Sequence, residues 1–371
     1  MTSPNGAVLA PPAALRAVDR KVVAGPGADR DGRLAPETVA ALAEAGFARH
    51  FVPRRWGGAA GSFGELVPAV VAVAEQCASA AWCAALWAWH ARFAALLPAA
   101  GQAQLWSASP DVLVAAALMP PAGRAEPVPG GFRLSGRWDC VSGVEHSQWI
   151  LLSTPGPAGA PLVLAVARAQ VTVERTWQAV GLRASGGDTV VVEDVTVPAH
   201  STMDATRMLG GDDNPGAARC HAAPAHLAGG LVLAAVGLGS ARAALAAWQA
   251  ALPGGDATSP AAATTLGRCA AELHAAELVL GAAARRADQG PITALTVAQN
   301  RRDGAFAADL AVTAVERLFR AGGAHTRNAG AAVNRAWRDV HTVAAHGALR
   351  FDAAAQAYAT ARSERPSHRD G

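Results

Sequence analysis

The hydrophobic and polar positions along the chain change their period twice. Residues 13–105 repeat apolar positions at helical spacing, and over 63–97 apolar residues occupy almost every side of the predicted helices. Residues 106–200 hold short β-branched or apolar runs separated by Gly, Pro and Asp, which is typical of a mostly antiparallel β domain. Residues 221–362 are Ala-rich and helical again, and loops containing Gly divide them into four or five long helices.

The changes of period predict the domain organisation. We expect an N-terminal helical domain over 1–105, a central β domain over 106–205 and a C-terminal helical bundle over 206–371. Within this plan, residues 201–220 are predicted to be a linker. The fold class is therefore α+β, mainly α. The predicted strands lie in the runs DVLVAAAL, GGFRLSGRW, QWILLST, PLVLAVA and TVVVEDVTV.

One segment, 221–241, is uncharged over about the length of a membrane-spanning helix. It also contains two His, a Pro and several Gly, and long helical segments flank it. We therefore predict a buried core helix and no membrane partner.

Composition narrows the class of protein. The chain has 371 residues, of which 51% are hydrophobic and 16% charged, so it is expected to be globular. Its net charge is only +3 and its basic residues are scattered, which argues against a nucleic acid partner. Five cysteines at irregular spacing, with no CxxC pair, indicate reduced thiols and neither a disulfide framework nor a metal site. The first twenty residues lack the pattern of a secretory signal, so we expect a cytoplasmic protein.

The stretch GRWDCVSGVEHSQWILLST, residues 136–154, does not fit a simple half-buried strand. Cys140, Ser142 and His146 interrupt a run that otherwise alternates between apolar and polar positions. Polar side chains at these positions suggest that this face meets something other than an apolar core.

Five motifs, in this order, resemble the acyl-CoA dehydrogenase superfamily over nearly the whole chain. Within it, the chain is most similar to the two-component flavin-dependent monooxygenases, such as the oxygenase component of p-hydroxyphenylacetate hydroxylase. The motifs are LAEAGFARHFVPRRWGG (42–58), SAAWCAALWAWH (79–90), GRWDCVSGVEHSQW (136–149), VGLRASGGDTVVVEDVTVP (180–198) and AGGAHTRNAGAAVNRAWRDVHTVAAH (321–346).

The resemblance implies an activity. Such an enzyme receives reduced FMN or FAD from a separate reductase, uses molecular oxygen as co-substrate, and oxygenates a small aromatic or polycyclic substrate through a C4a-hydroperoxyflavin. It also implies a homotetramer. No GxGxxG follows a predicted strand, so we expect no nicotinamide site here. The Ala-rich, Lys-poor composition is typical of a high-GC genome, in which such enzymes often serve secondary metabolism.

Matched by position, the resemblance also implies cofactor contacts. Ser142 falls where the family places a hydroxyl near flavin N5, and Cys140 falls where it places a ring-stacking aromatic residue. Leu118 and Met119 would offer backbone groups to the pyrimidine edge of the flavin. Gly322 and Gly323 would let a helix end approach the cofactor closely.

The same matching assigns two catalytic imidazoles, His90 and His346, which suit proton transfer near neutral pH. Each site residue also has a purely structural interpretation. His90 follows two tryptophans on an apolar helix and could be a hydrogen-bonded core residue. His341 lies close before His346 and competes for the same role, and Ser142 could bond only to backbone.

Two departures from the family keep alternatives open. An acyl-CoA dehydrogenase needs a carboxylate base, yet residues 324–350 contain no Glu and only one carboxylate, Asp339. A flavin dehydrogenase with its base elsewhere remains the first alternative. The loop 248–260 lacks the Arg that often reaches the flavin phosphates in this family. A flavin-less scaffold protein is therefore the second alternative.

Overall fold

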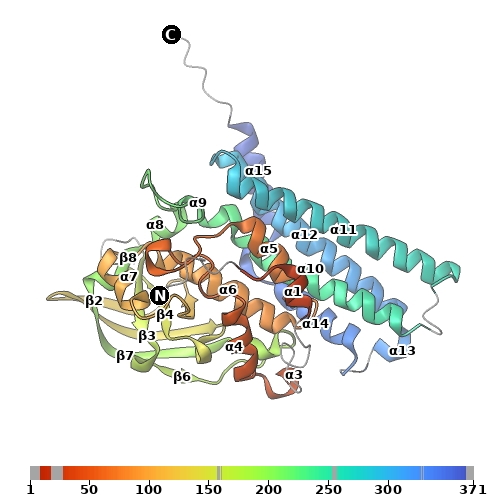
Figure 1. Ribbon diagram of the computed structural model, residues 1–371, viewed down its shortest axis with the longest axis horizontal. Helices are drawn as coiled ribbons and strands as arrows, with labels where there is room; N and C mark the ends of the chain where they lie inside the picture. Colours follow the sequence, from red (N-terminus) through yellow and green to blue (C-terminus); the bar gives the residue numbers. More distant parts are fainter. Residues whose placement is uncertain are drawn as a thin grey trace, which may run out of the picture.

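The computed structural model describes residues 9–364 apart from 18–27, 157–158, 160, 253–256, 327 and 329. The chain follows the predicted order of helices, strands and helices, so the fold is α+β and mainly α. Figure 1 shows the strands gathered at one end of the molecule and the long C-terminal helices extending from the other. The central part of the loop 248–260, which lacks the expected Arg, falls outside the described residues.

The N-terminal helices surround one that is almost fully buried. Ser62 begins α5 (Phe63–Ala74) with a capping box that it shares with Glu65. In α6 (Ala78–Ala94) every side chain except that of Leu86 is buried, which agrees with apolar residues on all its faces. The other helices of this part are α1 (Pro12–Ala17), α3 (Ala28–Asp31), α4 (Pro36–Glu44) and α7 (Ala99–Trp106).

Two four-stranded sheets follow, with strand orders β1-β4-β5-β8 and β2-β3-β7-β6. Among the strands of the described residues, β1 and β4 alone pair in parallel, which confirms a mostly antiparallel arrangement. The strands are β1 (Val114–Ala117), β2 (Arg124–Val128), β3 (Gly131–Val141), β4 (Trp149–Thr154), β5 (Leu162–Ala167), β6 (Thr172–Glu174), β7 (Asp188–Pro198) and β8 (Thr202–Asp204).

The first sheet is covered on both faces. Ile150 and Leu164 pack with Trp138 of the second sheet, whereas Leu151 and Val163 belong to the large core shared with the helices. Alternate residues of β4 and β5 therefore enter two different cores. This explains why both strands are continuous apolar runs in the sequence.

Three strands carry no apolar signal that sequence reasoning could use. β2 reads RAEPV and is exposed along most of its length, and β6 has only three residues. β8 pairs with β5 and lies inside 201–220, where we expected only a linker. These edge strands form because a neighbouring strand offers backbone hydrogen bonds, whatever their side chains.

The C-terminal part contains the five long helices expected. They are α10 (Ala225–Ala250), α11 (Pro260–Gln289), α12 (Ala294–Ala321), α14 (Ala332–Ala344) and α15 (Phe351–Ser363). Short helices α8 (Ala205–Gly210) and α9 (Arg219–Ala222) precede them, and α13 (Gly323–Thr326) lies between α12 and α14.

Helix α10 occupies the centre of this bundle. It is the one helix in the described part of the chain that is long and apolar enough to cross a membrane, yet 72% of its most apolar window is buried in the protein. A Cβ added to Gly239 would lie 2.4 Å from the carbonyl oxygen of Val71, so this glycine lets α10 approach α5 closely. The prediction of a buried core helix is confirmed.

Candidate active site

The polar stretch at the end of β3 contains a β-bulge. Trp138 pairs with Val190 and Val141 pairs with Asp188, so β3 has one residue more than its partner over this interval. The bulge includes Cys140, which has a positive φ of 60° and an exposed side chain. Asp139 and Cys140 are therefore both exposed, which answers why polar residues interrupt the alternation.

Ser142 follows the bulge and is buried at the start of a tight turn. Its Oγ accepts a hydrogen bond of 3.1 Å from the indole Nε1 of Trp82 on α6. The next residue, Gly143, has a positive φ of 68°, and a Cβ there would lie 2.8 Å from Nε1 of Trp87. Only glycine fits this close approach, and the turn thereby holds Ser142 against α6.

Helix α6 presents Trp82, Leu86 and His90 at intervals of four residues, so they lie on one face of the helix. Leu86 is the one residue of α6 that is not buried, which indicates that this face borders accessible space. His90 Nδ1 lies 3.1 Å from the carbonyl oxygen of Val114 in β1. A carbonyl can only accept, so Nδ1 carries the proton and Nε2 of the neutral ring carries the lone pair.

Burial determines the charge of His90. Desolvation, with a smaller contribution from the nearby His346, lowers the pKa of His90 to about 4. The residue is therefore neutral at pH 7. The contribution of His346 agrees with the position of its ring beside α6, where it contacts Trp82.

His346 has the opposite tautomer. It is the N-cap of the 3₁₀ helix η7 (Gly347–Leu349), and its Nδ1 accepts a hydrogen bond of 3.2 Å from the backbone N–H of Ala348. The neutral ring must then carry its proton on Nε2. The ring is accessible to solvent, but the protein around it still lowers its pKa by desolvation. Its ring centroid lies 5.7 Å from that of Trp82, in an edge-on contact.

Helix α6, the β3 turn and η7 thus bring together the three residues for which sequence reasoning predicted a catalytic role, Ser142, His90 and His346. We call these residues and Trp82 the Trp82 cluster. His341, the competing histidine, has other neighbours: its ring packs on Trp337 and lies 3.6 Å from a carboxylate oxygen of Glu316.

The other predicted cofactor contacts are divided between two places. Leu118 is half-buried and directly follows β1, whose first residue, Val114, accepts the hydrogen bond from His90. Met119, the next residue, is 71% exposed. Gly322 is the C-cap of α12 and Gly323 is the first residue of α13. The carbonyl of Thr326 in α13 accepts a hydrogen bond from the side chain of Asn334 in the first turn of α14. The 13-residue α14, roughly 20 Å long, separates these glycines from His346. Within one chain, these glycines lie before the N-terminal end of α14, whereas His346 follows its C-terminal end; Figure 1 labels α13 and α14.

Asp339, the one carboxylate of residues 324–350, is buried in α14. Its Oδ1 accepts a hydrogen bond of 2.7 Å from the backbone N–H of Leu182, which has a positive φ of 50°. The carboxylate therefore holds the loop before η4 (Arg183–Ser185) against the bundle. This hydrogen bond is a structural role for Asp339.

Sequence reasoning missed two residues of the site. Trp82 lies eight residues before His90, and this two-turn spacing was a usable signal. Ser185 had no such signal. Its carbonyl accepts from Gly143 N–H at 2.8 Å, and its buried Oγ has no hydrogen-bond partner among the described residues. An unpaired buried hydroxyl is costly, so Ser185 is a candidate donor to a bound group.

These residues fit a flavin. Ser185, whose carbonyl bonds to Gly143 in the Ser142 turn, has a buried hydroxyl without a partner among the described residues, and the side chains of Cys140 and Met119 are exposed and available to a ring system. The apolar surroundings and two imidazoles would exclude water while supplying hydrogen bonds. Ser142, Cys140, Leu118 and Met119 would then hold the ring.

Replacing Cys140 tests this placement. Because its side chain is exposed, Cys140→Phe should change the free energy of unfolding by less than about 0.5 kcal/mol. If the residue lies against the flavin, the same change should alter the dissociation constant for reduced flavin several-fold. Thermal unfolding and anaerobic flavin titration measure the two effects, with Cys140→Ser as the conservative control. Unaltered flavin binding would place Cys140 away from the ring.

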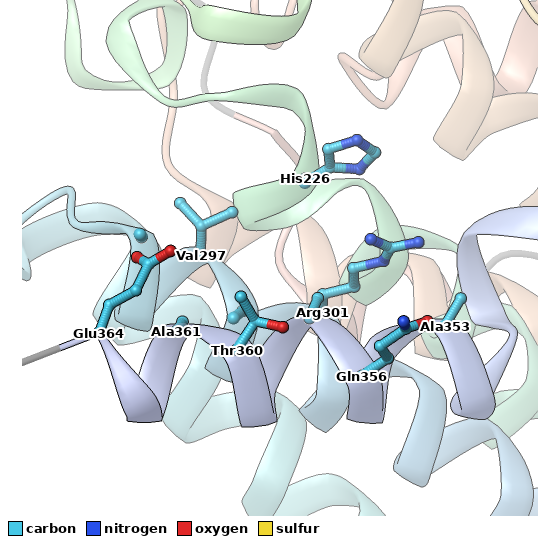
Figure 2. A pocket seen from close by; sticks show the side chains of 11 residues that line it. His226, Val297, Arg301, Ala353, Gln356, Thr360, Ala361 and Glu364 are labelled. Carbon is cyan, nitrogen blue, oxygen red and sulfur yellow. The ribbon is translucent and has the colours of Figure 1, made fainter.

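A second concave region lies elsewhere. A groove of about 620 Å³ runs between α10, α12 and α15, and its polar lining residues include His226, Arg301 and Glu364. Figure 2 shows His226 and Arg301 near one another and Glu364 toward the other end of the groove. No residue of the Trp82 cluster lines this groove, so it is separate from the candidate active site.

Several known proteins are similar to this chain in sequence. Residues 231–351 match the family model described as acyl-CoA dehydrogenase, C-terminal domain. The chain is 32% identical over 356 residues to the FADH(2)-dependent resorcinol hydroxylase, oxygenase component, of Rhizobium sp. (strain MTP-10005), with 86% of each chain covered. It is 28% identical over 344 residues to the flavin-dependent monooxygenase oxygenase subunit HsaA of Mycobacterium tuberculosis, with 85% of each covered.

Solved structures agree with these relatives. The 3-HSA hydroxylase from Rhodococcus sp. RHA1 superimposes with a TM-score of 0.86 at 25% identity, covering 96% of this chain and 95% of that one. XiaF from Streptomyces sp., solved in complex with FADH2 and glycerol, has a TM-score of 0.86 at 27% identity, covering 95% and 96%. The resemblance inferred from the motifs is confirmed over most of the chain.

Proposed function

This chain belongs to the acyl-CoA dehydrogenase superfamily, and within it to the oxygenase components of flavin-dependent monooxygenases; we propose that it hydroxylates an aromatic substrate. Membership rests on the 32% identity to a resorcinol hydroxylase over 86% of both chains. The chain is therefore a flavin-dependent monooxygenase. The substrate we propose is a small aromatic compound that carries a hydroxyl group, and the cofactor is reduced FAD.

The observation that carries the proposal is the pair of opposite tautomers in the Trp82 cluster. His346 presents an Nε2–H, and His90 presents an Nε2 lone pair, because each Nδ1 is engaged by backbone. One ring can therefore donate a proton while the other accepts a hydrogen bond. A substrate hydroxyl near both rings would be oriented from two sides.

Three side chains of the protein have different roles in the proposed reaction. Bound reduced flavin supplies the electrons that activate dioxygen. With flavin bound, Ser142 would offer a hydrogen bond at the N5 position, and the Nε2–H of His346 would be the proton donor to oxygen. With a pKa of about 4, His90 takes up a proton poorly at pH 7, so it serves as an acceptor that orients the substrate hydroxyl.

The relatives support the finer parts of the proposal. FADH2 appears in the names of the resorcinol hydroxylase and the XiaF complex, which favours FAD over FMN. The words "oxygenase component" and "oxygenase subunit" in the relatives' names support a separate reductase that delivers the reduced flavin. Aromatic substrates are suggested by the names resorcinol hydroxylase and indole-3-acetate monooxygenase. Trp82 and Leu86 give the site a matching apolar wall.

We also propose a cytoplasmic homotetramer, with a role in secondary metabolism. The position of Gly322 and Gly323 supports an oligomer. Because α14 separates them from the Trp82 cluster, they could approach a flavin there only if a second copy of the chain supplied them. Sedimentation of the purified protein tests the assembly.

The decisive experiment supplies reduced flavin without a reductase. Protein is mixed anaerobically with reduced FAD or reduced FMN and then with oxygenated buffer containing a panel of phenols, indoles and polycyclic phenols. We expect one hydroxylated product that carries one ¹⁸O atom from ¹⁸O₂. Reduction of oxidised flavin by an acyl-CoA, with no oxygen incorporated, would instead establish the dehydrogenase alternative.

Ser142→Ala should uncouple the reaction. One shielded hydrogen bond contributes about 1 kcal/mol, so its loss should raise the hydrogen peroxide released per reduced flavin several-fold at the expense of product. Peroxide and product are quantified in the same single-turnover mixture. Ser153→Ala is a suitable control, because Ser153 is a fully buried serine on β4 outside the cluster. Equal coupling in wild type and Ser142→Ala would remove Ser142 from the reaction.

A further inference from the structure

Trp82 joins two residues of the site that come from different domains. We infer that Trp82 is a positioning residue, whose indole N–H sets the direction of the Ser142 hydroxyl and whose ring edge holds His346 in place. The inference rests on the proposed function, because it assigns Trp82 a role in how that site handles reduced flavin and oxygen. Trp82 does not itself need to touch the reacting atoms.

The direction of the Ser142 hydroxyl follows from donor chemistry. An indole N–H can only donate, so Oγ of Ser142 must be the acceptor in the 3.1 Å bond. Trp82 is the only hydrogen-bond partner of this Oγ in the described part of the chain. One lone pair is therefore occupied on the α6 side. The hydroxyl proton and the second lone pair remain for a group on the other side of Ser142.

The bond is protected from water. Trp82 is 6% exposed and Ser142 is 9% exposed, so solvent cannot readily replace the indole as partner. In a shielded environment a hydrogen bond fixes orientation more strongly than it does at the surface. A free serine hydroxyl would rotate among three staggered positions, whereas this one is restricted before any ligand arrives.

The ring of Trp82 acts on His346 in a second way. The two ring planes meet at 66° with centroids 5.7 Å apart, and the backbone N–H of Ala348 donates to Nδ1 of the same imidazole. These two contacts together restrict the orientation of His346 and of its Nε2–H. Trp82 thus sets the relative positions of the Ser142 hydroxyl and the His346 proton.

A second tryptophan–serine pair on α6 provides a control for the Trp82–Ser142 bond. Trp87, five residues further along α6, donates its Nε1–H to Oγ of Ser147 at 3.2 Å, and both residues are buried. The Ser147 hydroxyl in turn donates to the carbonyl of Gly143 at 2.9 Å, so its proton is already used within the protein. The Trp87–Ser147 bond has the same chemistry and the same helix as Trp82–Ser142, but its hydroxyl has no proton left for a ligand.

Trp82→Phe tests the N–H, because it keeps an aromatic ring and removes the donor. We expect a several-fold rise in peroxide released per reduced flavin and a matching fall in product. The double variant Trp82→Phe/Ser142→Ala should be no worse than Ser142→Ala alone. Trp87→Phe should lower the melting temperature about as much as Trp82→Phe but raise the ratio of peroxide to product much less, because Trp87 contacts the turn at Gly143 and Ser147 and not the Ser142 hydroxyl. Equal uncoupling by Trp87→Phe, or none by Trp82→Phe, would overturn the inference.

A second measurement uses the protein without flavin. An NMR titration of His346 should give a higher pKa in Trp82→Ala, because water replaces the ring, and an unchanged pKa in Trp82→Phe. If wild type forms no oxygenated product but this titration behaves as expected, the proposed function fails and the positioning role stands. If Trp82→Ala leaves the His346 titration unmoved, the positioning role fails independently of the reaction.

Discussion

The variant His346→Asn is expected to form product about 10²-fold more slowly than wild type, because it lacks the proton donor. Asparagine is chosen because His346 is the N-cap of η7, and an amide oxygen can replace Nδ1 as acceptor for Ala348 N–H. Stability should therefore be retained. In His346→Ala the same loss of rate should come with a loss of about 1 kcal/mol of stability. Single-turnover product analysis and thermal unfolding measure the two effects.

His341→Ala is the control for this prediction. His341 packs on Trp337 near Glu316, so its removal should change the rate less than about twofold. Reduced flavin should bind to all three variants as it does to wild type. If His341 proved essential and His346 neutral, the site would lie one helical turn away from the Trp82 cluster. If neither mattered, imidazole chemistry would not be part of the reaction.

A large pH-dependent effect on stability is expected from His90. Its folded-state pKa of about 4 lies below its ordinary value of 6.5, so the folded protein binds fewer protons than the unfolded chain between these values. The part of the free energy of unfolding that depends on a neutral His90 is therefore fully present above pH 6.5 and is lost as the pH falls toward 4. The full difference corresponds to roughly 3 kcal/mol. His90→Gln, whose amide can still donate to Val114, should abolish this part of the acid sensitivity.

Urea unfolding at pH 7, 5.5 and 4.5 measures this difference between wild type and His90→Gln. Other buried histidines, such as His50 and His221, are present in both proteins, so their contributions cancel. His274 has a side chain 67% exposed and provides the control, because His274→Gln should leave the pH dependence as it is. Parallel curves for wild type and His90→Gln would mean that His90 can ionise freely inside the fold.

Sequence patterns located the elements that carry strong periodic signals. Helix α6 has apolar residues on all its faces, and the uncharged segment 221–241 supplies most of α10, so both were expected in the core, where the structure has them. Strands β4 and β5 were equally clear because both of their faces are buried. Strands β2, β6 and β8 were not predicted, because their short and exposed segments pair only when a neighbour is present.

Sequence reasoning named three members of the candidate site, but not Trp82 or Ser185 and not the arrangement. Matching the motifs to the family by position selected Ser142, His90 and His346, which lie in three separate parts of the chain. Nothing in the sequence indicated that Trp82 bonds to Ser142, because that contact joins residues 60 positions apart. The matching that grouped Gly322 and Gly323 with these residues could not show that α14 lies between them.

The sequence by itself determined the order of helices and strands, the class of fold and the family, because hydrophobic periodicity and motif spacing are properties of the linear chain. Only the tertiary structure decided the chemical state of the site. The tautomers of His90 and His346 depend on backbone partners supplied by β1 and η7, and the low pKa of His90 depends on burial. The orientation of Ser142 likewise depends on a bulge in β3 and an indole from α6, because hydrogen bonds and desolvation arise between segments that only folding brings together.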